Sequence, residues 1–236
     1  MSKKILIFGF LLLHAIAFFA QRERMKYLPT FDQKRIHFGF YLGLNQNDFK
    51  LNLRESTVTN TNTNITVAPN TGFIVGMIAD LRLNENLNLR FEPGLVSNSK
   101  IILFNHLNTS KESIREIGSS YIHVPLVLKF STNRYKNIRP YVLSGFSYDH
   151  NLSSNEKNQD DNSAGQFRMK THNFMYEVGV GIDFYLYFFK ISPSIRAVFA
   201  INNEIKYDDD PISKWTAPIN FLGTRGVFLT FAFESP

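Results

Sequence analysis

Residues Asn173–Phe184, which read NFMYEVGVGIDF, alternate strictly between two kinds of side chain. One parity is apolar throughout and consists of Phe174, Tyr176, Val178, Val180, Ile182 and Phe184. The other parity holds carboxylates, glycines and a methionine, namely Met175, Glu177, Gly179, Gly181 and Asp183. A strand separates these sets onto two faces, whereas a helix mixes them. The stretch is long enough for a tilted strand to cross a bilayer and carries aromatics at both ends of its apolar face. It therefore predicts a membrane-spanning strand or a half-buried strand of a soluble sandwich.

The same alternation recurs along the chain, and this recurrence favours the membrane strand. The eight predicted strands are Ile36–Asn45, Gly72–Leu83, Leu87–Val96, Tyr121–Phe130, Arg139–Tyr148, Asn173–Phe184, Lys190–Asn202 and Arg225–Glu234. In the fifth strand the parity stays open, because Tyr141 and Leu143 compete with Val142 and Phe146 for the apolar face.

The connections alternate between long and short. The first long connection follows Phe49, and the other three span Ser97–Ser119, Asp149–His172 and Asn203–Leu222. Within the second, Ile101–Phe104 is an alternative continuation of the third strand. The short ones are Asn84–Asn86, Ser131–Asn137 and Tyr185–Phe189. Short periplasmic turns and long external loops are typical of outer-membrane barrels. We therefore predict an all-β fold, an eight-stranded antiparallel transmembrane barrel of the outer membrane with both termini in the periplasm. The alternative, a soluble calyx such as a lipocalin, would carry its apolar parity inside.

The chain opens with a secretory leader. Lys3 and Lys4 precede an apolar run, Ile5–Phe19, which is short for a membrane span. We expect a signal peptide at residues 1–20, cleaved after Ala20, with an uncleaved anchor as the alternative. Residues 21–35 then form a polar periplasmic tail, and residues 36–236 form the barrel.

Composition narrows the class of protein further. Without Lys3 and Lys4 the formal net charge falls from +6 to +4, and no basic cluster points to nucleic acid. There is no cysteine, so disulfides and thiolate chemistry are excluded. The 23 phenylalanines and 10 tyrosines of an exported chain need an apolar environment, which a lipid-facing barrel wall provides.

The inward parity predicts a filled lumen. The assigned inward charges are Arg82, Arg90, Lys129 and Arg196 against Asp80, Glu92, Glu177 and Asp183. Buried charges require partners, and an eight-stranded barrel is narrow enough for its own side chains to fill. We expect an ion-pair network and not a porin channel, with a proton or ion path as the alternative. His37 and His123 also face inward and are expected to be polar filling.

No catalytic, cofactor or metal site is predicted. The histidines lack zinc-type spacing, and no nucleophile-elbow motif is present. The acidic run Asp208–Asp210 lies in an expected external loop and is either solvated or a calcium ligand set. We therefore expect a protein that is not an enzyme.

The stretch Tyr27–Leu51, YLPTFDQKRIHFGFYLGLNQNDFKL, resembles the start of the PorT family. The matching residues are Leu28, Pro29, Phe31, Asp32, His37–Phe40, Asn45, Asp48 and Phe49. The stretches Tyr121–Phe130, Arg139–Tyr148 and Gly179–Arg196 look like later strands of that family. The resemblance implies an outer-membrane barrel required by the type IX secretion system, which exports proteins with C-terminal sorting domains and delivers adhesins in gliding bacteria. It implies no catalytic residues.

The expected function is therefore that of an accessory or structural secretion subunit, and not of the export pore. The alternatives are an outer-membrane lipid-modifying enzyme and a small-solute pore. The expected partners are outer-membrane lipid and other type IX components. The tail residues Leu28, Pro29 and Phe31 have no place in the barrel wall, so we expect them to dock against the periplasmic mouth or onto a secretion partner.

Overall fold

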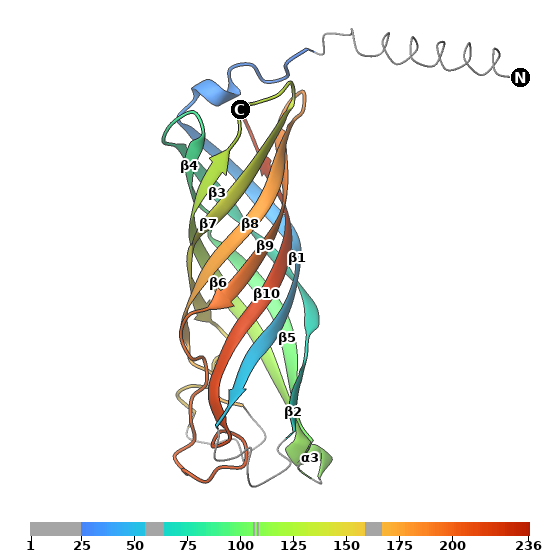
Figure 1. Ribbon diagram of the computed structural model, residues 1–236, viewed down its shortest axis with the longest axis vertical. Coiled ribbons are helices and arrows are strands. Elements are labelled where there is room, and N and C mark those ends of the chain that lie inside the picture. The colour runs from blue at the N-terminus through green and yellow to red at the C-terminus, as the bar shows by residue number, and fades with distance from the viewer. Residues whose placement is uncertain (1–24, 55–63, 106, 108, 159–166) are drawn as a thin grey trace, which may run out of the picture.

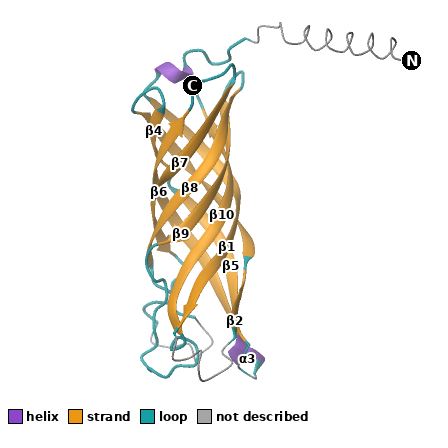
Figure 2. Ribbon diagram, in the orientation of Figure 1, coloured by secondary structure: helices purple, strands orange, loops and turns teal. Residues whose placement is uncertain are grey.

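The chain folds into a long closed β-barrel in the computed structural model (Figures 1 and 2). The structure describes residues 25–54, 64–105, 107, 109–158 and 167–236. The predicted signal peptide, residues 1–20, lies outside the described residues. No helix among the described residues is both long and apolar enough to span a bilayer.

Among the described residues, ten strand segments form the barrel wall, with two short helical elements at its ends. The helical elements are η1 (Phe31–Gln33) and α3 (Ser110–Ser113). The strands are β1 (Ile36–Leu53), β2 (Ile65–Ala68), β3 (Asn70–Arg82), β4 (Leu87–Phe91), β5 (Gly94–Phe104), β6 (Ile114–Ser131), β7 (Ile138–Asn151), β8 (His172–Tyr185), β9 (Lys190–Ala200) and β10 (Ile219–Glu234).

These ten segments make eight wall strands, as predicted. Only Pro69 separates β2 from β3, and Glu92 and Pro93 separate β4 from β5, so each pair continues one wall strand. Proline lacks the N–H that a ladder needs, which accounts for both interruptions. All pairings are antiparallel, and β1 pairs with both β3 and β10, which closes the barrel.

The two ends of the barrel differ. The turns β3–β4, β6–β7 and β8–β9 lie at one end, together with η1 and the C-terminus (Figure 1). We call this the turn end. The longer connections, including residues 152–158, 167–171 and 201–218, lie at the other end, which we call the loop end.

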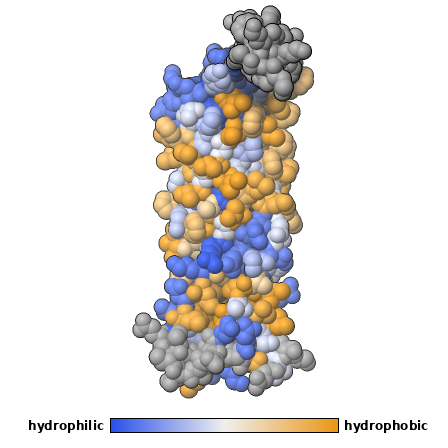
Figure 3. Space-filling model, turned by 45° about the vertical axis from the view of Figure 1, so that its right-hand side comes forward, coloured by the Kyte–Doolittle hydropathy of each residue, from blue (hydrophilic) through white to orange (hydrophobic). Residues whose placement is uncertain are grey.

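An apolar band surrounds the part of the barrel nearer the turn end (Figure 3). Its exposed side chains include Phe38, Phe40, Leu42, Met77, Leu126, Phe130, Val142, Phe146, Val180 and Phe231. On β7, Val142 and Phe146 face outward while Tyr141 and Leu143 are buried, which settles the parity of that strand. The predicted parity is confirmed in β8, where the outward side chains from Phe174 to Ile182 are exposed. Such a band suits a wall that faces lipid.

Several strands extend further toward the loop end than the sequence predicted. The long connection expected at Ser97–Ser119 is wrong, whereas the alternative continuation of the strand through Ile101–Phe104 is confirmed: β5 continues to Phe104 and β6 begins at Ile114. The loop expected from Asp149 begins after Asn151, and β10 begins at Ile219 and not at Arg225. These extensions lie beyond the apolar band, so their outward side chains need not be apolar. The alternation of apolar and polar residues that predicts a strand is therefore absent from them.

The loop-end connections fold into the barrel. Phe167, Met169, Ile205 and Trp215 come from these connections and are buried. They pack in one cluster with strand residues Phe49, Ile65, Ile102, Phe104, Ile117, Ile219 and Leu222. An apolar core therefore closes the loop end, which the expectation of solvated loops did not include.

Candidate functional site

A charged network fills the lumen between the turn end and the apolar core of the loop end, which we call the apolar plug. At its centre Arg90 is fully buried, with its Nε 2.7 Å from a Glu92 carboxylate oxygen. The Arg90 guanidinium also lies 3.8 Å from Asp80 and 3.8 Å from Glu234. One buried cation thus faces three carboxylates carried by different parts of the wall.

The network extends from Glu92 toward the loop end through Arg196 and an imidazole. Arg196 donates to Glu92 and lies 3.8 Å from Glu177. His123 lies between two carboxylates, with Nε2 3.1 Å from Glu177 and Nδ1 2.6 Å from Asp149. The wall residues of β4, β6, β7, β8 and β9 are thereby joined across the lumen.

The network extends toward the turn end through two lysines. Lys190 Nζ lies 2.9 Å from Glu234 and 4.0 Å from Asp183. Lys129 Nζ lies 2.7 Å from Asp183, which also accepts a hydrogen bond of 2.6 Å from Ser192. Each of these charged side chains is almost fully buried, so this part of the lumen is filled by the side chains of the wall.

Sequence parity predicted most of this network. Seven of the eight expected charges take part, but Arg82 does not: its Nε donates to the Asn84 carbonyl in the β3–β4 turn. The prediction missed Asp149, Lys190 and Glu234. Asp149 was assigned to a loop, whereas Lys190 and Glu234 stand at strand ends on the inward parity, so the alternation itself could have found them.

The described part of the predicted tail, from Met25 onward, folds across the mouth of the barrel at the turn end. Phe31 is 2% exposed, and its ring stacks on the imidazole of His37 with centroids 4.0 Å apart. Tyr185 meets the same ring edge-on at 5.8 Å, and Lys190 Nζ lies 4.7 Å from its centroid. His37 faces inward as expected, and it is the wall residue on which the tail rests.

Asp32 ties the tail to the turns. Its carboxylate accepts a hydrogen bond of 2.7 Å from the Tyr185 hydroxyl and forms ion pairs with Arg134 and Arg139. Arg134 also donates to the Leu28 carbonyl at 3.2 Å. The tail is thereby bonded to the β6–β7 turn, to β7 and to the end of β8.

The three tail residues singled out from the sequence have different environments. Phe31 is buried, Leu28 is half-buried and Pro29 is exposed. Leu28 has a positive φ of 50°, a backbone conformation that residues other than glycine rarely adopt. Docking of the tail on the mouth is thus observed for Phe31, and Pro29 remains accessible.

In the described part of the chain, no group of three or more His, Cys, Asp or Glu side chains has the geometry of a metal site. In the acidic run, Asp208 forms an ion pair of 3.2 Å with Arg168 and accepts a hydrogen bond of 3.0 Å from Thr216. Its oxygens therefore hold the loop in place.

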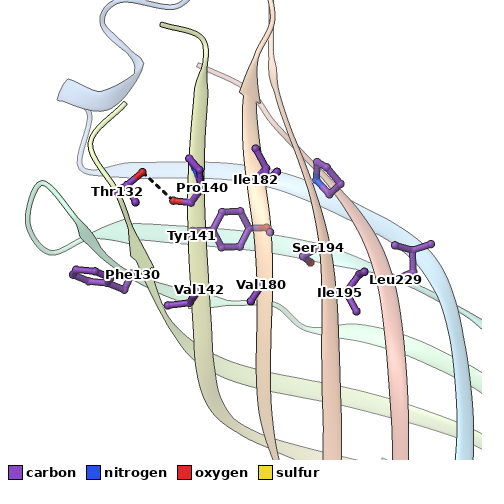
Figure 4. A pocket seen from close by; sticks show the side chains of 12 residues that line it. Phe130, Thr132, Pro140, Tyr141, Val142, Val180, Ile182, Ser194, Ile195 and Leu229 are labelled. Atoms are coloured by element: carbon purple, nitrogen blue, oxygen red, sulfur yellow. Dashed lines mark hydrogen bonds between the residues drawn. The ribbon is translucent and has the colours of Figure 1, made fainter. Parts of the chain in front are cut away.

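The outer wall carries an apolar groove of about 780 Å³, shown in Figure 4. Its lining includes Val142, Val180, Ile182, Ile195 and Leu229, all from the outward face of strands β7 to β10. The groove belongs to the apolar band and brings no charged side chain together.

A closed antiparallel barrel, apolar outside and charged inside, defines a β-barrel membrane protein. The chain belongs to the outer membrane protein beta-barrel domain family, whose model matches residues 19–206. It is thus an outer-membrane β-barrel protein. No curated protein matches the chain.

Solved barrels of bacterial outer surfaces are similar in structure but distant in sequence. Neisserial surface protein A has 11% identity and a TM-score of 0.45, with 83% of this chain and 96% of that one covered. The outer membrane protein OprG from Pseudomonas aeruginosa has 13% identity and a TM-score of 0.45, with 84% and 93% covered. The attachment invasion locus protein Ail of Yersinia pestis has 11% identity and a TM-score of 0.40, with 85% and 99% covered.

Proposed function

We propose that this outer-membrane barrel is an accessory or structural subunit of the type IX secretion system and not its export pore. The observation that carries the proposal is the folded tail across the barrel mouth. The tail and β1 are also the segment in which the sequence resembles the PorT family, from Tyr27 to Leu51. The resemblance therefore falls on the part of the molecule that has a distinct structural task.

The proposed orientation follows from the lengths of the connections. Outer-membrane barrels place their short turns in the periplasm and their long loops outside the cell. The turn end, with η1 and the C-terminus, then faces the periplasm, and the apolar plug lies at the cell surface. In this orientation the tail lies where a periplasmic component of a secretion apparatus can reach it.

The filled lumen supports an accessory role over that of a pore. Exported proteins and small solutes both need an open path, whereas this lumen holds a buried ion-pair network beneath an apolar plug. Opening a path would separate buried charges from their partners, which is costly. The barrel is better suited to act through its surface than through its interior.

The tail offers a defined docking surface at the mouth. Phe31 and Asp32 fix the segment, while Met25 is 79% exposed and Tyr27 is 38% exposed. Tyr27 packs edge-on against Tyr187 of the β8–β9 turn, which is itself exposed. A partner that contacts Tyr27 and Pro29 would meet an apolar and aromatic surface held in place by the buried anchor Phe31.

Secretion by a strain that lacks the gene tests the proposal. A clean deletion should abolish release of proteins with C-terminal sorting domains while the outer membrane stays intact. Complementation with Tyr27→Ser/Pro29→Ser should insert a heat-modifiable barrel that no longer restores secretion, because only the exposed surface has changed. Gln33→Ser, in the exposed and polar part of the tail, is the matched control and should restore secretion. Normal secretion in the deletion strain would remove the proposal.

A further inference from the structure

A polar pocket opens on the outer wall where the apolar band ends toward the loop end. His150 of β7 pairs with Ile122 of β6 on one side and with His172 of β8 on the other. All three side chains are on the outward parity, and Phe174, two residues from His172, is 54% exposed. Because a strand rises about 3.3 Å per residue, His172 lies about 7 Å along β8 from Phe174, the last aromatic side chain of the band. His150 lies beside it on β7. On the face drawn in Figure 3, hydrophilic side chains lie directly beyond the apolar band toward the loop end.

The two imidazoles are held side by side. The Tyr148 hydroxyl lies 2.6 Å from Nδ1 of His172, and the Tyr148 and His172 rings stack with centroids 6.0 Å apart. The His150 and His172 rings have centroids 5.2 Å apart. Tyr148 in turn contacts Phe174 at 5.6 Å. The cluster therefore connects the aromatic edge of the band to the pocket.

The pocket has a volume of about 670 Å³ and gathers basic groups from two strands and two connections. Lys157 and Lys206 come from the two loop-end connections and join His150 and His172 in its lining. Within the described parts of the chain, neither ammonium group forms a hydrogen bond or an ion pair. The lining contains one carboxylate, Glu156, which accepts a hydrogen bond of 2.8 Å from the Thr171 amide. The Glu156 carboxylate thus holds its loop against β8 and also interacts with the charge of Lys206, so one carboxylate faces two ammonium groups and a net positive charge remains in the pocket.

We propose that this pocket binds the phosphate of a phosphorylated glycolipid in the outer leaflet of the membrane. Lysine ammonium groups and imidazole N–H groups are donors that match phosphate oxygens. The choice of a lipid over a soluble anion rests on position, because a headgroup held here leaves its acyl chains beside Phe174 and Phe146 of the apolar band. The choice of the outer leaflet rests on the orientation proposed above, and nothing in the inference depends on the role in secretion.

Binding of lipid A to the full chain in phosphatidylcholine nanodiscs tests the inference. The probe is lipid A with both phosphates, and the comparison lipid is the same molecule with its phosphates removed. The variant Lys157→Ala/Lys206→Ala should bind phosphorylated lipid A at least tenfold more weakly than the wild type. The matched control is Lys50→Ala/Lys214→Ala, which removes two exposed lysines near the loop end but outside the pocket. It should bind like the wild type.

Three outcomes would overturn the inference. Equal affinity for the two lipids would show that phosphate is not recognised. Equal losses in the two double variants would show a general effect of charge and no specific pocket. If inorganic phosphate displaces lipid A when both are at the same concentration, the pocket binds a free anion and not a lipid. Heat-modifiability of each variant on gels establishes that the barrel is folded, so loss of binding cannot be confused with loss of structure.

Discussion

The ring of Phe31 stacks on the imidazole of His37, with centroids 4.0 Å apart and planes inclined by 10°. Nε2 of the same imidazole lies 2.9 Å from the Phe31 carbonyl oxygen. The tail and the first wall strand are thus joined by a ring contact and a polar contact between two residues. Since β1 is also the strand that closes the barrel against β10, the position of the tail is tied to barrel closure.

Phe31→Ala should release the tail from the mouth while the barrel stays closed. The side chain is 2% exposed, and truncating a buried phenylalanine costs about 3–5 kcal/mol in protein cores. The closed wall has its own hydrogen bonds, so this loss falls on docking of the tail. Trypsin cleavage after the exposed Lys34 and Arg35 should accelerate at least tenfold.

The control for that experiment is Thr30→Ala, next to the anchor but exposed. Its cleavage rate should match that of the wild type. If Phe31→Ala is cleaved no faster than this control, the ring contact does not hold the tail.

Glu92→Gln should destabilise the barrel without opening it. Glu92 is the carboxylate shared by Arg90 and Arg196, and both guanidinium groups would lose their closest charged partner. Removing one partner of a buried ion pair costs about 3–5 kcal/mol. The urea midpoint of unfolding in lipid vesicles should fall accordingly, and planar bilayers should show no steady conductance for either protein. A stable channel in the wild type would contradict the filled lumen.

The alternation of apolar and polar residues predicted the barrel wall because lipid imposes it. In β8, all five outward side chains from Phe174 to Ile182 are apolar and exposed on the outer wall. Beyond the band the constraint disappears. Residues Asn98–Phe104 of β5 keep an inward parity of Asn98, Lys100, Ile102 and Phe104, but this mixture of polar and apolar side chains carries no strand signal.

Partners across the lumen were beyond the reach of the sequence. Parity places Glu92 and Arg196 inside, but the pairing of two residues 104 positions apart depends on barrel closure and stagger. The same holds for Asp32 and Tyr185, 153 positions apart. The inward folding of Phe167 and Trp215 was equally hidden, because residues in irregular connections have no period to reveal which way they face.

Glu204→Gln should change how stability depends on pH. The carboxyl is fully buried at the loop end and accepts two hydrogen bonds of 2.8 Å from Thr224, one from its amide and one from its hydroxyl. Burial raises the pKa of Glu204 above its ordinary value, against the opposing effects of the Lys100 ammonium and the Thr224 hydrogen bonds. The folded protein therefore holds the Glu204 proton more tightly than the unfolded chain does.

Stability conferred by that proton is present below the ordinary glutamate pKa of about 4.3 and is lost as pH rises through the raised folded value. The neutral amide of the variant has no proton to lose. The wild type should hence lose stability relative to Glu204→Gln as pH rises through this window. Above the window, the difference in unfolding free energy between the two proteins should stay constant. Urea titrations of both proteins at a series of pH values measure the difference, in which other titrating groups cancel. A difference that stays constant with pH would show that Glu204 does not titrate in this way.

Gly94→Ala should strain the barrel wall at the place where Tyr41 crosses the lumen side of β5. A Cβ at Gly94 would stand 2.4 Å from the Tyr41 hydroxyl and 2.7 Å from the Val75 carbonyl oxygen, both too close for any real contact. The hydroxyl is fixed, since it donates a hydrogen bond of 2.9 Å to the Glu92 carbonyl. Overpacking of this kind costs about 1–3 kcal/mol, which a lower urea midpoint would record.

The barrel provides a matched control for this substitution. A Cβ at Gly118, on β6 near the loop end, would meet no atom within 4 Å, so Gly118→Ala should stay within about 0.5 kcal/mol of the wild type. In a Tyr41→Ala background the clash with the hydroxyl is gone, and Gly94→Ala should cost less than it does in the wild type, because only the contacts with the Val75 carbonyl oxygen and the Gly76 Cα remain. Equal costs of Gly94→Ala in the two backgrounds would mean that the tyrosine does not determine the need for glycine at this position.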